Sequence, residues 1–417
     1  MNKFQTLIVL TQSYPFDKAQ EKTFLQDEIL QLSGQFLEIY IIPKETKYVK
    51  YGNIGNAICV NEFDNYLSKK LFLFDLKFYR NLIVIFFHEI KFSSTSFDLK
   101  SLLVLIKSAF LASAFLTWFS LFYLRNNLQK NNVLIYSFWF DSIVSSLSWF
   151  KNKSSYFTVV TRCHSIDLYE ERRETSYIPF RSIAIKNLDF IFPDSNRGAN
   201  YLSCKYPEFD FKIQTLFQGV LGAHFSITNS SDGKLRFISC SYVSKRKRVD
   251  QIFNVLNAYS LLYPQNLIEW YHIGSGPDFE ELSNLVQSKS ETFNVHLLGN
   301  LDHSTMFEFY KNNELDFFLN FSENEGTPVS LMEAASCGFA FIVTDVGGNS
   351  DLVTPQNGFI IDPSINIDQV VGIINQVFNN KHLIINLSKE SKFIWQKKFN
   401  LNINTLNFVR TVNRKLK

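Results

Sequence analysis

The chain repeats one local pattern in two separate series, and this repetition constrains its fold more than any other feature. Short apolar runs alternate with segments whose apolar residues recur at helical spacing. Strands joined by helices form parallel sheets, because a parallel pair needs a long crossover. In the first series we expect a helix at Phe24–Leu32 and strands at Thr6–Leu10, Leu37–Ile42, Val133–Tyr136, Tyr156–Thr161 and Phe190–Phe192.

The second series begins after a polar segment, Asn229–Gly233, whose Asn, Ser, Asp and Gly residues are typical of a linker. Beyond it we expect a helix at Val249–Leu262 and strands at Leu235–Cys240, Ile268–Ile273, Val295–Leu298, Phe317–Asn320 and Ala340–Thr344. A chain of 417 residues also exceeds one core, since single cores stop growing at ~250–300 residues. We therefore predict α/β domains at 1–222 and 234–390, followed by a helical segment (Phe393–Val412) within 391–417.

Charge and cysteine content exclude several classes of protein. Lys and Arg number 42 and Asp and Glu 39, a net charge of +3 that argues against a nucleic-acid partner. Five widely spaced cysteines without a C-x-x-C pair argue against a disulfide framework and a structural zinc site. The first apolar run, Leu7–Leu10, is too short for a signal peptide. We therefore expect a cytoplasmic protein without a metal site.

Aromatic residues are concentrated in one region, since residues 71–150 hold 14 of the 43 Phe. Within it, Ala109–Leu124 carries no charge, and extension back to Leu102 adds only Lys107. A membrane-spanning helix needs about 20 apolar residues, which this stretch reaches only by including Lys107 and several Ser and Thr residues. We expect a helix that is buried or that rests on a membrane surface, with a true span as the alternative.

A capped helix is predicted directly after the expected strand Phe317–Asn320. Thr327 can cap such a helix, Pro328 suits its first position and Gly338 suits its end. The segment between them is therefore a short helix at the carboxyl end of a parallel strand.

The start of this helix has the pattern of an anion site. The backbone around Thr327, Pro328, Val329 and Ser330 forms a helix N-terminus, which favours an anion such as a diphosphate. Glu325 precedes the helix and Glu333 lies in its second turn. The spacing predicts a phosphate site flanked by two carboxylates; an ordinary capped helix with two solvated acids is the alternative.

A basic loop follows the expected strand Leu235–Cys240. Ligands of open parallel sheets bind at the carboxyl ends of the strands, and cations there can neutralise a leaving diphosphate. We assign this role to Lys247, with Arg248 beside it, and expect Lys245 and Arg246 to be solvated. The next strand ends in a turn with Gly274 and Gly276, a weak signal by itself because turn glycines are common.

The first series has one candidate group, Arg162, His164 and Asp167, after the expected strand Tyr156–Thr161. A His with a nearby Asp at a strand end can bind or polarise a substrate hydroxyl, and a structural His is the alternative. The six other histidines show no ligand-like spacing, so no metal site is predicted.

Together these segments resemble the retaining glycosyltransferases of the GT-B fold, specifically glycosyltransferase family 4, or group 1. The most specific match is E-x7-E, from Glu325 to Glu333 within EGTPVSLMEAASCG, followed by TDVGG from Thr344. KRVD, GSGP and a Gly after a strand follow the family's order, at Lys247–Asp250, Gly274–Pro277 and Gly299. Three further segments resemble bacterial surface-polysaccharide members: YPFDKAQEKTFLQDEI (Tyr14–Ile29), RCHSIDLYEER (Arg162–Arg172) and FIWQKKFN (Phe393–Asn400).

The resemblance implies two Rossmann-like domains facing a cleft, with the acceptor at the N-terminal domain, the nucleotide sugar at the C-terminal domain, and the terminal helix packed back on the former. It assigns Glu333 to the ribose, Glu325 to the transferred sugar, Lys247 to the diphosphate and His164 to the donor sugar. The remaining donor-side candidates are Arg248, Gly274, Gly276, Thr327, Pro328, Val329 and Ser330, and the acceptor-side candidates are Arg162 and Asp167. The family often places Arg five residues before the lysine, where this chain has Tyr242, so we expect Arg248 or Arg246 to supply that charge.

The implied activity is metal-independent, retaining transfer of a hexosyl group. The donor is UDP- or GDP-linked, a substrate rather than a cofactor, and the acceptor is a saccharide, lipid-linked, in capsule, O-antigen or exopolysaccharide synthesis. No Asp-x-Asp occurs in the chain, in agreement with metal-independent transfer. In this class the acceptor attacks from the front face and the leaving phosphate helps to take its proton, so Glu325 is not assigned as a covalent nucleophile. A GT-B nucleotide-sugar epimerase and a non-catalytic partner protein remain as alternatives, and peripheral contact with the inner membrane face is expected.

Overall fold

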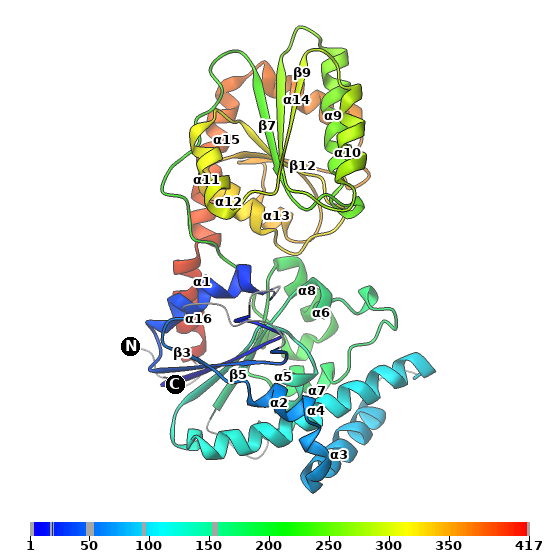
Figure 1. Ribbon diagram of the computed structural model, residues 1–417, viewed down its shortest axis with the longest axis vertical. Coiled ribbons are helices and arrows are strands. Elements are labelled where there is room, and N and C mark those ends of the chain that lie inside the picture. Colours follow the sequence, from blue (N-terminus) through cyan, green and yellow to red (C-terminus); the bar gives the residue numbers. More distant parts are fainter. Residues whose placement is uncertain are drawn as a thin grey trace. The chain divides into compact units, whose positions relative to one another are not determined.

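The chain folds into two compact α/β units, seen in the computed structural model of Figure 1. The structure describes residues 4–16, 19, 21–46, 54–93, 97–151 and 157–414. One unit comprises Met1–Phe217 with Asn404–Lys417, and the other comprises Gln218–Ile403. Each contains one six-stranded sheet whose strand pairs are all parallel, so the predicted fold of two Rossmann-like sheets is confirmed.

The sheet of the N-terminal unit has the strand order β3-β2-β1-β4-β5-β6. Its strands are β1 (Thr6–Thr11), β2 (Glu38–Pro43), β3 (Ala57–Cys59), β4 (Val133–Ser137), β5 (Phe157–Cys163) and β6 (Phe190–Pro193). The helices between them are α1 (Lys22–Ser33), α2 (Glu62–Ser68), α3 (Leu76–Phe92), α4 (Leu99–Arg125), α5 (Ser142–Lys151), α6 (Ser165–Leu168), α7 (Arg181–Asn187) and α8 (Asn196–Lys205). Short 3-10 turns lie at η1 (Leu71–Phe74), η2 (Leu128–Lys130), η3 (Glu170–Arg172) and η4 (Pro207–Lys212). Every residue of β1, β4 and β5 is buried, as expected for strands of a parallel sheet that is covered on both faces.

The sheet of the C-terminal unit has the order β12-β11-β10-β7-β8-β9. Its strands are β7 (Leu235–Cys240), β8 (Ile268–Ile273), β9 (Phe293–Gly299), β10 (Phe317–Asn320), β11 (Ala340–Thr344) and β12 (Gly358–Ile361). Its helices are α9 (Val249–Leu262), α10 (Phe279–Leu285), α11 (His303–Asn312), α12 (Val329–Cys337), α13 (Asn349–Leu352), α14 (Ile367–Phe378) and α15 (Lys381–Ile394), with 3-10 turns η5 (Lys245–Lys247) and η6 (Val286–Ser288). Because β7 and β10 are parallel neighbours, the loops that follow them lie side by side at the carboxyl end of the sheet.

The helical segment predicted at Phe393–Val412 is interrupted. After α15 the chain forms a short π-helix, η7 (Trp395–Phe399), and a separate helix, α16 (Leu401–Asn413), follows. Asn400 is extended, and its side-chain oxygen accepts the backbone N–H groups of Asn402 and Ile403, so it ends one element and caps the next. The last turns of α16 bury Phe408 in the core of the N-terminal unit, in ring contact with Tyr136 and Phe192.

The C-terminal half of α4 forms part of the core of the N-terminal unit. Phe115, Trp118, Phe119 and Phe122 are buried there, and Phe119 stacks on Phe115 with ring centres 5.4 Å apart. By length and composition α4 could cross a membrane, yet 56% of its most apolar window is buried within the protein, and core helices pass the same test. Most of the apolar stretch predicted at Ala109–Leu124 therefore serves the domain core, whereas Phe110 and Leu124 in it are exposed.

Phe119→Ala is expected to lower the free energy of unfolding by about 3–5 kcal/mol, the usual cost of removing a buried aromatic ring. Phe119 is fully buried, so the cavity left behind cannot fill from solvent. Chemical denaturation would measure the loss. Phe87→Ala is the matched control, because this ring lies exposed on α3 and its removal should change the stability by less than about 1 kcal/mol. Equal losses in the two variants would contradict the assignment of α4 to the core.

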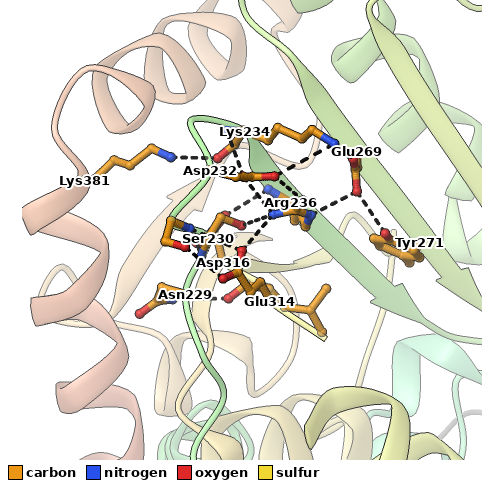
Figure 2. A network of polar contacts seen from close by, with 12 residues as sticks. Asn229, Ser230, Asp232, Lys234, Arg236, Glu269, Tyr271, Glu314, Asp316 and Lys381 are labelled. Carbon is orange, nitrogen blue, oxygen red and sulfur yellow. Dashed lines mark hydrogen bonds and ion pairs between the residues drawn. The ribbon is translucent and has the colours of Figure 1, made fainter. Parts of the chain in front are cut away.

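A network of ion pairs and hydrogen bonds holds the segment Asn229–Gly233, before β7, against the sheet (Figure 2). The Arg236 guanidinium pairs with Asp232 at 2.7 Å, Glu269 at 2.9 Å and Glu314 at 3.2 Å. The Asp316 carboxylate accepts the backbone N–H groups of Ser230 and Arg236, both at 2.9 Å. The polar segment predicted as a linker is thus held against the amino ends of β7, β8 and β10, and it belongs to the C-terminal unit.

Candidate functional site

The loops after β7 and β10 bring Lys247 and Glu325 into direct contact. The Lys247 ammonium donates to the Glu325 carboxylate at 2.5 Å, and the two side chains are only 15% and 9% exposed. The Asn320 amide, at the end of β10, also donates to this carboxylate at 3.4 Å. Two groups that the sequence assigned to different parts of a donor therefore lie within one hydrogen bond of each other, and each neutralises the other's charge.

The Glu325 loop is held in place from the neighbouring strand, β11. Gly347 has φ +54°, and a Cβ there would lie 2.0 Å from the Glu325 carbonyl oxygen. The next residue, Gly348, donates its N–H to the Gly326 carbonyl at 2.7 Å. The Thr344 hydroxyl donates to the Ser322 carbonyl at 2.6 Å. The TDVGG segment thus provides the close backbone packing that fixes the carboxylate, and only glycine fits at position 347.

The helix after this loop starts one residue later than the sequence predicts. Pro328 is the N-cap of α12 and Val329 its first residue, so Thr327 does not cap it. Proline lacks a side-chain acceptor, and here it fixes the extended entry into the helix. Ser330 lies in the first turn, and Gly338 ends the helix in the left-handed conformation with φ +86°, as predicted.

Glu333, in α12, pairs with a histidine that the sequence did not single out. Its Oε1 lies 2.9 Å from Nε2 of His303, the first residue of α11. Asp302 caps that helix by accepting the N–H of Thr305 at 3.0 Å. Glu333 is buried, whereas the His303 side chain is 67% exposed. An exposed imidazole can leave a buried carboxylate at little cost, so Glu333 can exchange this partner for a ligand.

Arg248 does not share the site of Lys247. Its guanidinium donates to the Pro363 carbonyl at 2.5 Å and lies 3.4 Å from Glu323. It borders a pocket of about 610 Å³ between α9, α10 and the 363–365 loop, and among the described residues no other predicted donor-side residue lines that pocket. Tyr242 and Arg246 are exposed. Of the predicted donor-side cations, Lys247 is therefore the one that contacts Glu325.

The glycines after β8 serve backbone packing. A Cβ at Gly274, which has φ +136°, would lie 1.9 Å from the Ser241 carbonyl oxygen, and one at Gly276 would lie 2.2 Å from that of Val243. The Val243 N–H donates to the Ser275 carbonyl at 3.1 Å. The GSGP turn therefore supports the loop that carries Lys247.

In the N-terminal unit, His164 follows β5 and both of its ring nitrogens face protein acceptors. Nδ1 lies 3.2 Å from the Asp194 carboxylate and Nε2 lies 3.1 Å from the Phe138 carbonyl. Burial alone would lower the pKa of His164, but the hydrogen bond to Asp194 and the charges of Asp194 and Asp167 outweigh it and raise the pKa. Two acceptors favour the doubly protonated ring, so this environment suits a cation rather than a general base.

The acceptor-side candidates are engaged inside the N-terminal unit. The buried Arg162 guanidinium donates to the Tyr136 hydroxyl at 2.7 Å, the Leu216 carbonyl at 2.7 Å and the Glu28 carboxylate at 3.1 Å. Asp167 accepts the backbone N–H groups of Phe140 and His164 at 2.7 Å and 2.6 Å. Asp167 thus holds the loop that carries His164, whereas Arg162 joins β5 to β4, α1 and the segment at Leu216.

Asp194→Asn is expected to lower the pKa of His164, because it removes the charge that stabilises the imidazolium. In the wild-type protein the pKa of His164 is raised, so its stabilising contribution is complete below about pH 6.5, the ordinary value for histidine, and is lost as the pH rises through the folded-state value. The free energy of unfolding of the variant should therefore fall less than that of the wild type as the pH rises above about 6.5. Proton NMR titration, with His164→Gln to assign the resonance, would measure the pKa directly. An unchanged His164 pKa would contradict the assignment.

No group of three or more His, Cys, Asp or Glu side chains is placed to hold a metal ion among the residues that the structure describes.

Two curated relatives share sequence with parts of the chain. The UDP-N-acetylglucosamine–peptide N-acetylglucosaminyltransferase GtfA subunit of Streptococcus pneumoniae is 27% identical over 214 residues, 49% of this chain and 40% of the relative. The O-antigen biosynthesis glycosyltransferase WbnH of Escherichia coli is 33% identical over 90 residues, 22% of this chain and 24% of the relative. The chain thus spans less than half the length of these curated relatives.

Solved structures match almost the whole chain. The lipopolysaccharide outer core galactosyltransferase WaaB superposes with a TM-score of 0.65 at 15% identity, over 98% of this chain and 99% of that one. HepE of Anabaena, solved in complex with UDP, superposes with a TM-score of 0.62 at 12% identity, over 98% of this chain and 100% of that one. Residues 223–393, which include Lys247, Glu325 and Glu333, match the family described as glycosyl transferases group 1. The whole chain therefore has the GT-B fold, and residues 223–393 of it are similar to the glycosyl transferases of group 1.

Proposed function

We propose that this chain is a retaining glycosyltransferase that moves a hexosyl group from a UDP- or GDP-linked donor to a saccharide acceptor. The observation that carries the proposal is the pairing of Lys247 with Glu325 beside α12, within the residues that match the group 1 family. The two relatives carry transferase names, and one of them names a UDP-sugar donor.

The donor is proposed to bind at the carboxyl edge of the C-terminal sheet. Glu333 exchanges His303 for the ribose hydroxyls, and the start of α12 receives the diphosphate. Lys247 turns from Glu325 to the diphosphate, which leaves Glu325 free to accept hydrogen bonds from the transferred sugar. This exchange is favourable because a doubly charged diphosphate attracts an ammonium more strongly than one carboxylate does.

The chemical step is cleavage of the bond between the anomeric carbon and the diphosphate. Charge develops on the leaving oxygen while the sugar gains oxocarbenium character. Lys247 stabilises that oxygen, and a pre-positioned cation is most effective where water is excluded. The acceptor oxygen then bonds to the anomeric carbon and its proton passes to the leaving phosphate, so no protein base is required.

The acceptor is proposed to bind at the N-terminal unit, near His164. A lipid-linked saccharide in capsule, O-antigen or exopolysaccharide synthesis agrees with the name of one relative, an O-antigen biosynthesis glycosyltransferase. The protein would then work in the cytoplasm, peripherally on the inner face of the membrane.

The proposal is tested by incubating the purified chain with a panel of UDP- and GDP-sugars, with and without saccharide acceptors. We expect binding of one donor, slow hydrolysis without acceptor, and a product whose anomeric configuration equals that of the donor. Release of an epimerised sugar without acceptor would indicate an epimerase instead. Binding of no donor in the panel would point to a non-catalytic partner protein.

A further inference from the structure

The N-terminal unit exposes apolar side chains in one region above all others. Fourteen of the thirty large apolar side chains that the described residues expose lie between Leu71 and Phe110, on η1, α3 and the N-terminal half of α4. Phe74 and Leu76 are 87% and 86% exposed. Contiguous exposed apolar surface on a folded protein marks an interaction site.

On α3 these side chains form a stripe at helical spacing. Leu76, Ile83, Phe87 and Ile90 are exposed, whereas Phe78, Ile85 and Glu89 of the same helix are buried. In contrast, α14 of the other unit buries Val370, Val371, Ile374 and Val377, its apolar stripe. The outward stripe of α3 is therefore a property of this helix and not of the composition of the chain.

The two halves of α4 differ in the same way. Leu99, Leu103, Ile106 and Phe110, spaced as on one helix face, are exposed, whereas the positions from Ala112 to Phe119 are all buried. Figure 1 shows α3 lying along the N-terminal half of α4, with both extending away from the sheet of their unit. The apolar surface thus begins upstream of the stretch that the sequence suggested for membrane contact and overlaps only its start, at Leu103, Ile106 and Phe110.

The charges of this region are arranged to favour an anionic partner. Residues 69–107 contain seven Lys or Arg and three acids. Asp75 and Asp98 accept backbone N–H groups at the starts of α3 and α4. Glu89 is buried and accepts the Tyr177 hydroxyl at 2.8 Å and the Phe180 N–H at 3.0 Å. The acids are thus used to build the helices. The cations Lys69, Lys70, Lys77, Arg80, Lys91 and Lys107 are exposed on or next to the same elements, and Lys100 is exposed but pairs with Glu174.

We infer that η1, α3 and the N-terminal half of α4 form a docking surface for a bilayer that contains anionic phospholipids. The apolar stripes enter the boundary between headgroups and acyl chains, and the surrounding Lys and Arg side chains contact the phosphates. Apolar stripes bordered by cations match the acyl-chain and phosphate layers of a bilayer surface. A soluble protein partner would not require both apolar stripes and bordering cations. The core half of α4 stays in the domain, so the protein docks on the membrane without crossing it.

The test is flotation of the full chain with vesicles of phosphatidylcholine alone or with about 30% phosphatidylglycerol, a typical anionic surface. We expect the wild type to float with the anionic vesicles, and we expect added salt to weaken this binding. Phe74→Glu/Phe87→Glu should reduce binding on the order of 100-fold, because both rings lose their burial. Lys77→Gln/Lys91→Gln should reduce it roughly 20-fold.

The matched control is Leu37→Glu/Phe211→Glu, which adds the same two charges to the same unit at side chains 76% and 69% exposed. It should bind within about twofold of the wild type, because separated surface charges are screened. Equal loss in this control would show a general charge effect and overturn the proposal. Two other results would also overturn it. In the first, the wild type does not bind vesicles but forms a dimer that dissociates in Phe74→Glu/Phe87→Glu. In the second, the wild type can be removed from membranes only with detergent, as expected of a protein that spans them.

The proposal does not depend on the proposed transferase activity. Phe74→Glu/Phe87→Glu should retain the wild-type melting temperature and full transfer to a short, water-soluble acceptor while losing vesicle binding. Loss of transfer to the soluble acceptor in this variant would contradict a role limited to docking. An inactive wild type that still floats would overturn the proposed function alone.

Discussion

Replacing Glu333 with alanine is expected to weaken binding of the nucleotide-sugar donor by roughly 100-fold or more. The carboxylate is buried and is held by one exposed partner, His303. On donor binding it would accept two ribose hydroxyls, and hydrogen bonds to a charged group contribute about 1.5–3 kcal/mol each. Calorimetry with the nucleotide sugar, and with the free nucleoside diphosphate, would measure the loss.

His303→Ala is the control for Glu333→Ala. It removes the histidine from the same carboxylate but leaves the carboxylate in place, so donor affinity should stay within a few-fold of the wild type or improve. Glu333→Gln, which keeps the shape but not the charge, should lie between the two. A donor affinity that Glu333→Ala leaves unchanged, or that His303→Ala lowers to the same extent, would contradict the ribose assignment.

Replacing Lys247 with alanine is expected to reduce kcat roughly 100- to 1,000-fold, the usual cost of losing one group that stabilises charge in the transition state. Affinity for the donor should fall less than kcat, because the interaction strengthens as the leaving oxygen gains charge. Single-turnover assays with saturating donor would separate the two effects.

The neighbouring Lys245→Ala is the matched control for Lys247→Ala, because this lysine lies on the same turn but is exposed. It should retain wild-type turnover. The pairing with Glu325 adds a second readout: Lys247→Ala leaves a carboxylate that is 9% exposed without its cation, which should lower the melting temperature. Lys247→Ala/Glu325→Gln should recover that stability but not the activity. Normal turnover in Lys247→Ala would exclude the diphosphate assignment.

The alternation of strands and helices allowed most of the fold to be predicted. The strands Leu235–Cys240, Ile268–Ile273, Phe317–Asn320 and Ala340–Thr344 match the structure residue for residue. β3 and β12 were missed because three or four residues at the edge of a sheet carry little periodicity. The break before α16 was missed because apolar spacing continues across Asn400, whose capping role depends on its side-chain geometry.

The candidate site was predictable only in its local parts. Spacing within one segment placed Glu325 before a helix and Glu333 inside it, since both positions follow from helix geometry. The Lys247–Glu325 contact joins residues 78 positions apart, and it requires the strand order that places β7 beside β10. His303 could have been found from Asp302 and Thr305, a capping pair that places it in the first turn of a helix.

The two ends of β7 differ in how well they can tolerate amino-acid substitutions. At the amino end, Arg236 pairs with three carboxylates and Lys234 with two of them, so loss of Arg236 would leave Glu314 without its cation and three acids facing one lysine, which endangers folding. At the carboxyl end, the loop with Lys247 rests on backbone contacts that most side-chain substitutions leave intact. If the proposed donor site is correct, its preference can be redesigned at one end of the strand while the other end keeps the unit folded, and a library confined to the loops after β7 and β10 should yield folded variants.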